Sequence, residues 1–195
     1  MPDRLSQQFA FLLEIDRLKQ INRQTLIADG TRRENDAEHS WHLAVMATLL
    51  AEYAPPGADI ARVTRMLLVH DVVEIDAGDT YCYDQSACET QSQREQAAAD
   101  RIFALLPADQ AVEIRKLWEE FEARETPESR FAAALDRIQP VLLNYHTQGR
   151  AWQEKGVTRA QVIERNQHIE AGAPRLWAYI EQLIDDAVTK GYLNP

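Results

Sequence analysis

The segment LLVHDVVEIDAGD, residues 67–79, decides how this chain is interpreted. It ends a helical pattern whose apolar residues recur every three or four positions: Ile60, Val63 and Leu67. The next positions of the same stripe hold His70, Asp71 and Glu74, where a core helix would carry Leu or Val. Because unpaired ionisable groups are costly to bury, such groups are normally paired with each other or bound to a metal ion. The stripe therefore predicts a buried metal site at the end of this helix.

The composition predicts one helical domain over residues 1–195. The chain is 45% hydrophobic, which suffices for a sizeable core, and it contains only 7 Gly and 8 Pro. The net charge of −10 argues against a nucleic acid polymer as partner, since such partners need a basic surface. It leaves room for a small phosphorylated ligand, because a bound divalent cation reverses the local field.

The two cysteines and the absence of a signal peptide predict a cytoplasmic protein. Cys82 and Cys88 have no second pair, which excludes a Cys-type zinc site. They can form a disulfide, but in the cytosol they stay reduced. No apolar run approaches the roughly 20 residues that span a bilayer, so we expect no membrane partner.

Apolar periodicity and cap residues predict an all-α bundle of roughly seven or eight helices. Between residues 75 and 90 the helical period is lost, and we expect a long functional loop there. The inner face of the second helix is predicted to consist of Trp41, Ala44, Val45, Thr48 and Leu49. The expected helices lie at about residues 5–22, 36–54, 60–74, 92–106, around 114–121, and at 127–148, 158–171 and 174–190.

Metal-type side chains recur on or near three inner faces. His39 lies in the first turn of the second helix, His70 and Asp71 at the end of the third, and Asp136 in the sixth. Such a mixed nitrogen and oxygen set suits one divalent metal ion, namely Mn, Co, Fe, Zn or Mg. Glu74, one turn after His70, is placed to orient a metal-bound water or to move its proton.

These residues resemble the HD-domain superfamily of metal-dependent phosphohydrolases, whose pattern is His, then His-Asp, then a distant Asp. The resemblance is closest to the small bacterial 5′-deoxynucleotidases, which hydrolyse nucleoside monophosphates, and implies the HD-type helical bundle. It is carried by RLKQINR at 17–23, RRENDAEHS at 32–40 and HDVVEIDAGD at 70–79.

The resemblance also implies a role for each matching residue. The metal ligands would be His39, His70, Asp71 and Asp136. Arg23 would bind the substrate phosphate, whose oxygens match a guanidinium fork. Glu74 would act on the nucleophilic water or the leaving group. Asp79 would lie at the sugar end of the substrate, near the scissile ester.

Two departures from that branch concern the substrate. The deoxynucleotidases have a tryptophan after the phosphate-binding arginine, which packs on the sugar and helps to exclude ribose. This chain has Gln24 there, a hydrogen-bonding side chain with no ring to stack, so the sequence leaves open whether ribose or deoxyribose is preferred. After Asp79 the segment TYCYD replaces a loop with proline and lysine, and Tyr81 and Tyr83 either stack on a base or cover a hydrophobic edge.

The predicted function is removal of phosphate from a small phosphomonoester, with a nucleoside 5′-monophosphate as substrate. The alternatives are an HD-type pyrophosphohydrolase, a cyclic-nucleotide phosphodiesterase, and a metal- and nucleotide-binding sensor without catalysis. Triphosphate hydrolysis needs more basic side chains around the pocket than an acidic chain is expected to offer. The intact Glu74 and Asp79 argue against the sensor. An apolar surface with Trp177, Tyr179 and Ile180 predicts a homodimer.

Overall fold

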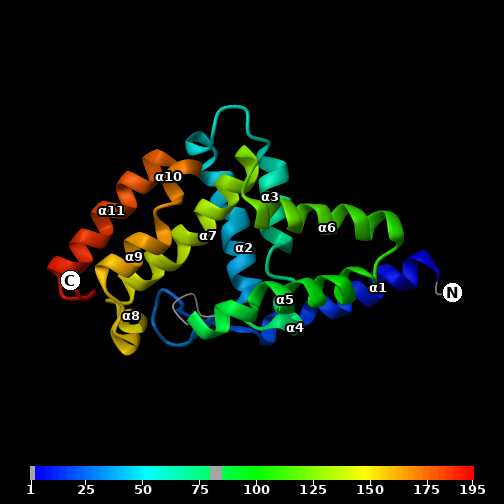
Figure 1. The fold of residues 1–195 in the computed structure, drawn as a ribbon, viewed down its shortest axis with the longest axis horizontal. Helices are drawn as coiled ribbons and strands as arrows, with labels where there is room; N and C mark the ends of the chain where they lie inside the picture. The colour runs from blue at the N-terminus through cyan, green and yellow to red at the C-terminus, as the bar shows by residue number, and fades with distance from the viewer. Residues whose placement is uncertain (1–2, 80–84) are drawn as a thin grey trace.

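Helix α7 (Pro127–His146) runs through the centre of the structure, a computed structural model that describes residues 3–79 and 85–195. Thr126 accepts a hydrogen bond from the amide of Ser129, and Pro127 occupies the first turn, so α7 begins where its cap residues predict. It packs against α2 (Asp36–Leu49), α3 (Ile60–Val69) and α6 (Ala108–Ala123), as Figure 1 shows. The site residues lie where these helices meet.

The other elements complete an all-α fold, which confirms the predicted class. No helix among the described residues is long and apolar enough to cross a membrane. The elements are α1 (Arg4–Ile15), η1 (Asp16–Gln20), β1 (Asn22–Leu26), β2 (Arg33–Asn35), η2 (Ala51–Tyr53), α4 (Glu74–Ala77), α5 (Gln85–Phe103), α8 (Arg150–Lys155), α9 (Arg159–Asn166), α10 (Ile169–Gly172) and α11 (Pro174–Thr189).

A short β-hairpin lies where the sequence predicts the end of a helix and an irregular connector. Strands β1 and β2 pair antiparallel, with Asn22 opposite Asn35 and Leu26 opposite Arg33. The first helix ends at Ile15 and is followed by the 3₁₀ turn η1. A two-stranded hairpin is barely stable alone, and this one packs on α7 and η1. Because its stability comes from these contacts rather than from its own residues, the local sequence does not indicate it.

The predicted inner face of α2 is wrong. Trp41 is 65% exposed and Leu49 72%, whereas Leu43 and Ala47 are fully buried. The buried face starts with polar site residues in the first turn, so the apolar stripe visible in the sequence lies on the neighbouring face.

The segment predicted as a loop between residues 75 and 90 is shorter than expected. Helix α4 begins at Glu74, and α5 begins at Gln85, before the predicted start at Ser92. Residues 85–91 contain no Gly or Pro and extend the helix backwards. Tyr81, Cys82 and Tyr83 lie outside the described residues, as does the side chain of Cys88.

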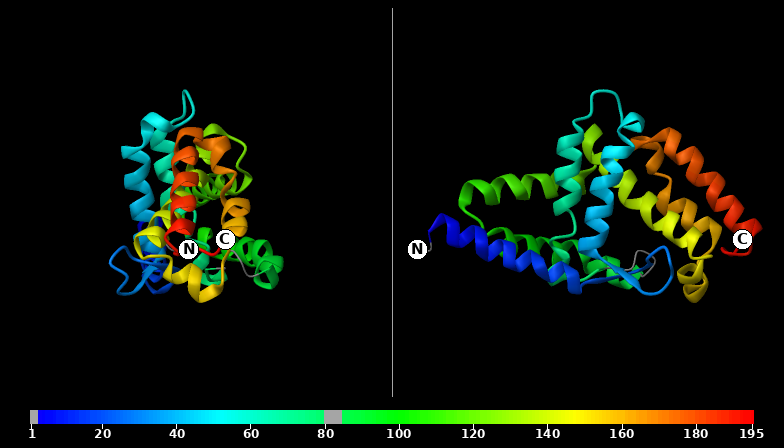
Figure 2. Two further views of the ribbon diagram at one scale, coloured as in Figure 1. Left: turned by 90° about the vertical axis from the view of Figure 1, so that its left-hand side faces the viewer. Right: turned by 180° about the vertical axis from the view of Figure 1, so that it is seen from behind.

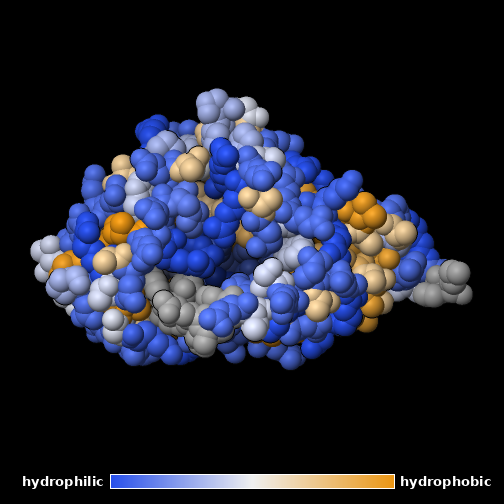
Figure 3. Space-filling model, viewed as in Figure 1, coloured by the Kyte–Doolittle hydropathy of each residue, from blue (hydrophilic) through white to orange (hydrophobic). Residues whose placement is uncertain are grey.

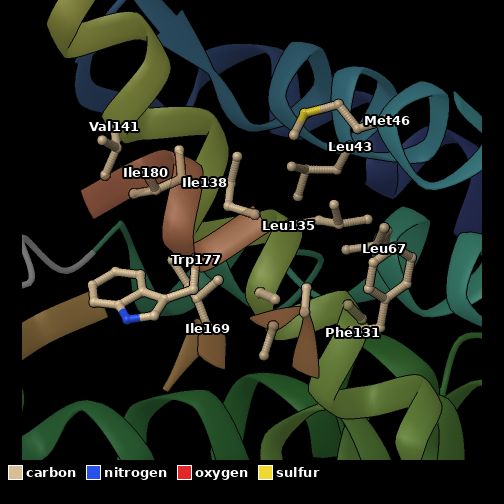
Figure 4. Packing of buried hydrophobic residues seen from close by; sticks show 14 of the residues in the cluster. Leu43, Met46, Leu67, Phe131, Leu135, Ile138, Val141, Ile169, Trp177 and Ile180 are labelled. Carbon is tan, nitrogen blue, oxygen red and sulfur yellow. The ribbon is translucent and has the colours of Figure 1, made fainter. Parts of the chain in front are cut away.

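Two hydrophobic clusters hold the helices around the site. One is formed mainly by α2, α3, α7 and α11, and Figure 4 shows Leu43, Leu67 and Leu135 converging within it. The other joins α1, α5 and α6, which extend to one side of the domain in Figure 2. His70 and Asp71 follow α3 at the junction of the two clusters, so packing on both sides determines their position.

The surface on which the homodimer was predicted is largely part of the core. Trp177 is 5% exposed and Ile180 1%, and both belong to the cluster around α7. Only Tyr179, 56% exposed, is available on this surface. The buried pair lies on the face of α11 that packs on the rest of the domain, so their spacing indicates core packing.

We expect Gly172→Ala to destabilise the fold by about 2–3 kcal/mol, because the added methyl group overpacks a helix contact. A Cβ at Gly172 would lie 2.2 Å from the carbonyl oxygen of Arg130 on α7. Gly57 has a positive φ of 82° but open space around it, so Gly57→Ala should cost only about 1 kcal/mol. Urea unfolding of both variants measures the difference, and equal losses would contradict the close packing of α10 on α7.

Candidate metal centre

The structure brings the four predicted metal ligands together from three helices. His39 comes from the first turn of α2, His70 and Asp71 directly follow α3, and Asp136 lies in the middle of α7. All four are buried, at 8% exposure or less. The His39 Nε2 atom lies 3.0 Å from Asp136 Oδ1, and His70 Nε2 lies 3.1 Å from Asp71 Oδ1. One atom from each of His39, His70 and Asp136 falls within 4.8 Å of the others.

The orientation of His70 is that of a metal ligand. Its Nδ1 lies 2.9 Å from the carbonyl oxygen of Leu67, which can only accept, so Nδ1 carries the hydrogen. The other ring nitrogen, Nε2, is buried and has no hydrogen-bond partner among the described residues. It faces the carboxylate oxygens of Asp71 and Asp136, at 3.1 and 3.8 Å. A metal ion at this position would be bound by Nε2 and by these carboxylates together.

Gln139 orients the second imidazole. The His39 Nδ1 atom lies 3.2 Å from Gln139 Oε1, and Gln139 Nε2 donates to Glu34 and approaches His42. Nδ1 of His39 therefore donates, and Nε2 faces Asp136. Burial and Arg23 lower the pKa of His39, but hydrogen bonds to Asp136 and Glu34 outweigh them and raise it to about 9. In the metal-free chain Nε2 thus holds a proton that a metal ion displaces.

A second group of carboxylates adjoins the first, and its member Asp36 is missing from the sequence prediction. Asp36, Asp71 and Glu74 each place an oxygen within 4.8 Å of the others. Asp36 is fully buried inside α2, whose N-cap is Asn35. Burial and the Asp71 carboxylate raise the pKa of Asp36 to about 7. Its position three residues before His39, on the same helix face, is the sequence signal that identifies it.

Arg23 is the predicted phosphate-binding residue, and strand β1 places it among these carboxylates. One terminal nitrogen lies 2.9 Å from Asp71 Oδ2 and 3.4 Å from Asp36 Oδ1, and 11% of the side chain is exposed. Burial opposes the charge of Arg23, but Asp71 and Glu74 outweigh it and raise its pKa further. Its Nε is buried without a hydrogen-bond partner in the described part of the chain.

Glu74 and Asp136 differ in protonation. Burial raises the pKa of Glu74 well above its usual range, and Asp71 and Asp36 add to the effect. Burial also opposes ionisation of Asp136, but Arg137 and His39 lower its pKa well below the usual range. Asp136 is therefore an anionic ligand, whereas Glu74 can hold a proton. The donors fit a divalent ion: two imidazoles and buried carboxylates with more negative charge than Arg23 compensates.

The site opens into a pocket of about 360 Å³, on the face where Figure 3 shows a hydrophilic hollow. Gln24 and Asp79 line this pocket together with His70, Asp71 and Asp136. The side chain of Gln24 is oriented by Arg33, which donates a hydrogen bond to its Oε1.

The expectation of few basic side chains around the pocket is wrong. Four arginines line it, namely Arg23, Arg124, Arg137 and Arg165. They come from separate elements of an acidic chain, so neither the net charge nor a local motif indicates that they converge.

Replacing Gln139 by methionine should lower metal affinity about 10–100-fold, the usual effect of losing a group that orients a metal-binding histidine. Methionine has a similar length but cannot accept the proton of His39 Nδ1. The control is Gln182→Met on the exposed side of α11. Calorimetric titration with Mn²⁺ measures the affinity, and equal constants for both variants would show that Gln139 does not support a metal ligand.

Known proteins share sequence with most of this chain. A family model described as HD domain matches residues 15–177. Human 5′-deoxynucleotidase HDDC2 is 32% identical over 133 residues, which are 68% of this chain and 64% of that protein. The chain therefore spans less than two thirds of the human relative's length.

Two solved structures share the fold. One, described as a predicted metal-dependent phosphohydrolase from Magnetospirillum magnetotacticum, is 57% identical with a TM-score of 0.95, over 98% of this chain and 96% of that one. The other, an HD-domain phosphohydrolase from Listeria innocua, is 18% identical with a TM-score of 0.62, over 94% and 86% of the two chains. The second likeness concerns the fold alone. With the family model matching residues 15–177, this chain belongs to the HD-domain family.

Proposed function

We propose that this chain is a divalent-metal-dependent phosphohydrolase that removes phosphate from a nucleoside 5′-monophosphate. The observation that carries the proposal is the position of Arg23, which lines the same pocket as His70, Asp71 and Asp136. Its Nε makes no hydrogen bond to the described residues and lies 4.0 Å from Glu34 Oε2, and the guanidinium as a whole is a fork that matches the oxygens of a phosphate. A phosphate in this pocket would contact Arg23 and the metal-ligand cluster together.

The residues that would hold the metal are His39, His70, Asp71 and Asp136. When bound there, a divalent ion polarises the phosphoryl group and lowers the pKa of a bound water. Arg23 binds the phosphate and balances the charge that develops on its oxygens in the transition state. The carboxylates around Arg23 hold its guanidinium in place before the substrate arrives.

Glu74 is the proposed proton carrier. Its Oε2 is buried without a hydrogen-bond partner in the described part of the chain, and its raised pKa lets it hold a proton near neutral pH. It can therefore deliver a proton to the leaving 5′ oxygen or, once ionised, accept one from the attacking water. Asp79 lines the pocket next to these groups, and we place it at the sugar of the substrate.

The size of the pocket and the relatives support a nucleotide as substrate. A volume of about 360 Å³ lies in the range of small-molecule sites. Several curated relatives bear the name 5′-deoxynucleotidase.

We also propose that the protein is cytoplasmic and forms a homodimer. Because Trp177 and Ile180 are buried, we place the dimer contact on another apolar surface, at the exposed Trp41 and Leu49 of α2. Sedimentation velocity decides whether a dimer exists.

The first test is phosphate release from ribo- and deoxyribonucleoside 5′-monophosphates with Mn²⁺, Co²⁺ or Mg²⁺. We expect release that a chelator abolishes. Asp71→Ala should reduce the rate and the metal content, the rate by more than about a hundredfold, because it removes a ligand rather than a supporting group. The control Asp185→Ala removes an exposed carboxylate on α11 and should change neither.

Unchanged metal content and unchanged phosphate release in Asp71→Ala would refute the proposed site. Saturable nucleotide binding without any release by the unmodified protein would favour the sensor. Release from cyclic nucleotides or triphosphates but not from monophosphates would favour the other two alternatives.

Gln24→Trp should increase the preference for deoxyribonucleotides over ribonucleotides by about tenfold, the usual effect of a pocket that sterically excludes one group. The indole would fill the space that a 2′-hydroxyl needs, and it cannot accept a hydrogen bond from it. The measurement is the ratio of kcat/KM for the deoxy and ribo forms of one nucleotide. Gln24→Ala separates the loss of the amide from the presence of the ring, and an unchanged ratio in Gln24→Trp would place the sugar elsewhere.

A further inference from the structure

A basic wall, defined as Arg124, Arg137 and Arg165, lines part of the pocket that contains the metal-ligand cluster. Arg124 ends α6, Arg137 lies on α7 and Arg165 lies on α9. Arg137 joins this wall to the cluster, because its terminal nitrogen lies 3.3 Å from Asp136 Oδ2. A ligand in the pocket can therefore contact the metal-ligand cluster and the basic wall together.

Two members of the basic wall make no ion pair within the described part of the chain. Within residues 3–79 and 85–195, neither Arg124 nor Arg165 has an ion-pair partner. The Nε of Arg165 is buried and makes no hydrogen bond to the described residues. Burial and the charge of Arg137 lower the pKa of Arg124, and Asp136 and Glu122 only partly oppose this effect. Half-buried like charges of this kind favour an anion between them.

Arg124 also has a backbone conformation that is unusual for an arginine. Its φ is 53° and its ψ is 35°, the left-handed conformation in which a helix end normally carries Gly or Asn. An arginine in this position strains the backbone, and no ion pair within the described residues compensates for it. Strain of this kind is concentrated at ligand-binding sites.

A histidine, His168, lies near the three arginines of the basic wall and is neutral. Burial, Arg124 and the other two arginines lower the pKa of His168 to about 4, so its ring carries no charge at neutral pH. Its Nε2 is buried without a hydrogen-bond partner in the described part of the chain. His168 therefore adds a polar group to this region without adding to the repulsion.

We propose that Arg124 and Arg165 bind a second phosphate group of the nucleotide substrate. This inference rests on the proposed function, because the first phosphate lies at Arg23 and the metal-ligand cluster. Guanidinium groups bind phosphate oxygens through charge-assisted, often bidentate hydrogen bonds. Two kinds of substrate carry such a group: a nucleoside 3′,5′-bisphosphate, with the second phosphate on the sugar, and a nucleoside 5′-diphosphate, with the second phosphate next to the first.

The reaction is hydrolysis in both cases. With the bisphosphate, the oxygen of water bonds to the 5′ phosphorus, the bond from phosphorus to the 5′ oxygen breaks, and this oxygen takes a proton; the products are inorganic phosphate and the nucleoside 3′-monophosphate. With the diphosphate, water attacks the terminal phosphorus and the bridging oxygen leaves with the 5′-monophosphate. The basic wall would hold the phosphate that does not react.

The test compares kcat/KM for a nucleoside 5′-monophosphate, its 3′,5′-bisphosphate and its 5′-diphosphate, all with Mn²⁺. We expect one of the doubly phosphorylated nucleotides to exceed the monophosphate by about tenfold or more, mainly through a lower KM, as charge-assisted hydrogen bonds imply. Which one does so identifies the position of the second phosphate. Arg124→Gly and Arg165→Gln should each remove most of this advantage.

The variants separate binding from folding. Glycine suits the left-handed backbone, so Arg124→Gly should keep or raise the Tm while it removes the charge. The control Arg159→Gln removes an exposed arginine at the start of α9, outside the pocket, and should keep the advantage of the second phosphate. An advantage that persists in Arg124→Gly and Arg165→Gln, or that is absent from the unmodified protein, would overturn the inference.

Failure of the proposed function gives a different result. In that case no nucleotide, including the monophosphate, releases phosphate. Calorimetric titration with the same three nucleotides then tests the basic wall without hydrolysis. Tighter binding of a doubly phosphorylated nucleotide, weakened about tenfold by Arg124→Gly or Arg165→Gln, supports the second phosphate site; equal affinities in all variants overturn it.

Discussion

The structure depends on an excess of negative charge buried at the meeting point of its helices. Asp36, Asp71, Glu74 and Asp136 are each at most 8% exposed, and the cations Arg23 and Arg137 contact members of this group. A hydrophobic core tolerates such a group only when its charges are compensated. Three neighbouring features contribute to this compensation: a hairpin that carries Arg23, the imidazole of His39, which holds a proton in the metal-free chain, and a carboxyl group, Glu74, that also holds a proton.

Different parts of the helices pack the core and form the site. Helix α7 carries Asp136 and Gln139 on a face that is otherwise apolar, and the clusters on both sides fix its position. The hairpin, the first turn of α2, the ends of α3 and α6, and helix α9 supply the remaining site residues. Side chains at the ends of packed elements are held firmly, and they lie where the pocket opens. One pocket thus contains a cluster suited to a cation and a basic wall suited to an anion.

The sequence predicted the parts of the site that interrupt a regular pattern. His70, Asp71 and Glu74 stand out because they replace apolar residues on a helical stripe, and α7 was located from Thr126 and Pro127. The residue types alone suggested the four ligands as one mixed nitrogen and oxygen set, and the family pattern was needed to support it, since nothing local relates His39 to Asp136. Asp36 was not predicted as a site residue, because an acidic residue is common at the start of a helix.

The remaining parts depend on tertiary structure and leave no local signal. The hairpin forms because it packs on α7, and the buried face of α2 is polar where it meets the site. Gln139 on a helix gives no sign that it faces an imidazole. The basic wall assembles arginines from three helices, so its existence follows only from their arrangement in space.

The contact between His39 and Asp136 joins residues that are 97 positions apart in the chain. Closing a loop of that length is entropically unfavourable until most of the domain has formed, so the complete ligand set arises late in folding. A metal ion held there would link two parts of the chain that are separated by half of its length. It would slow the opening of the domain far more than it would speed its assembly, and so would lengthen the lifetime of the native protein.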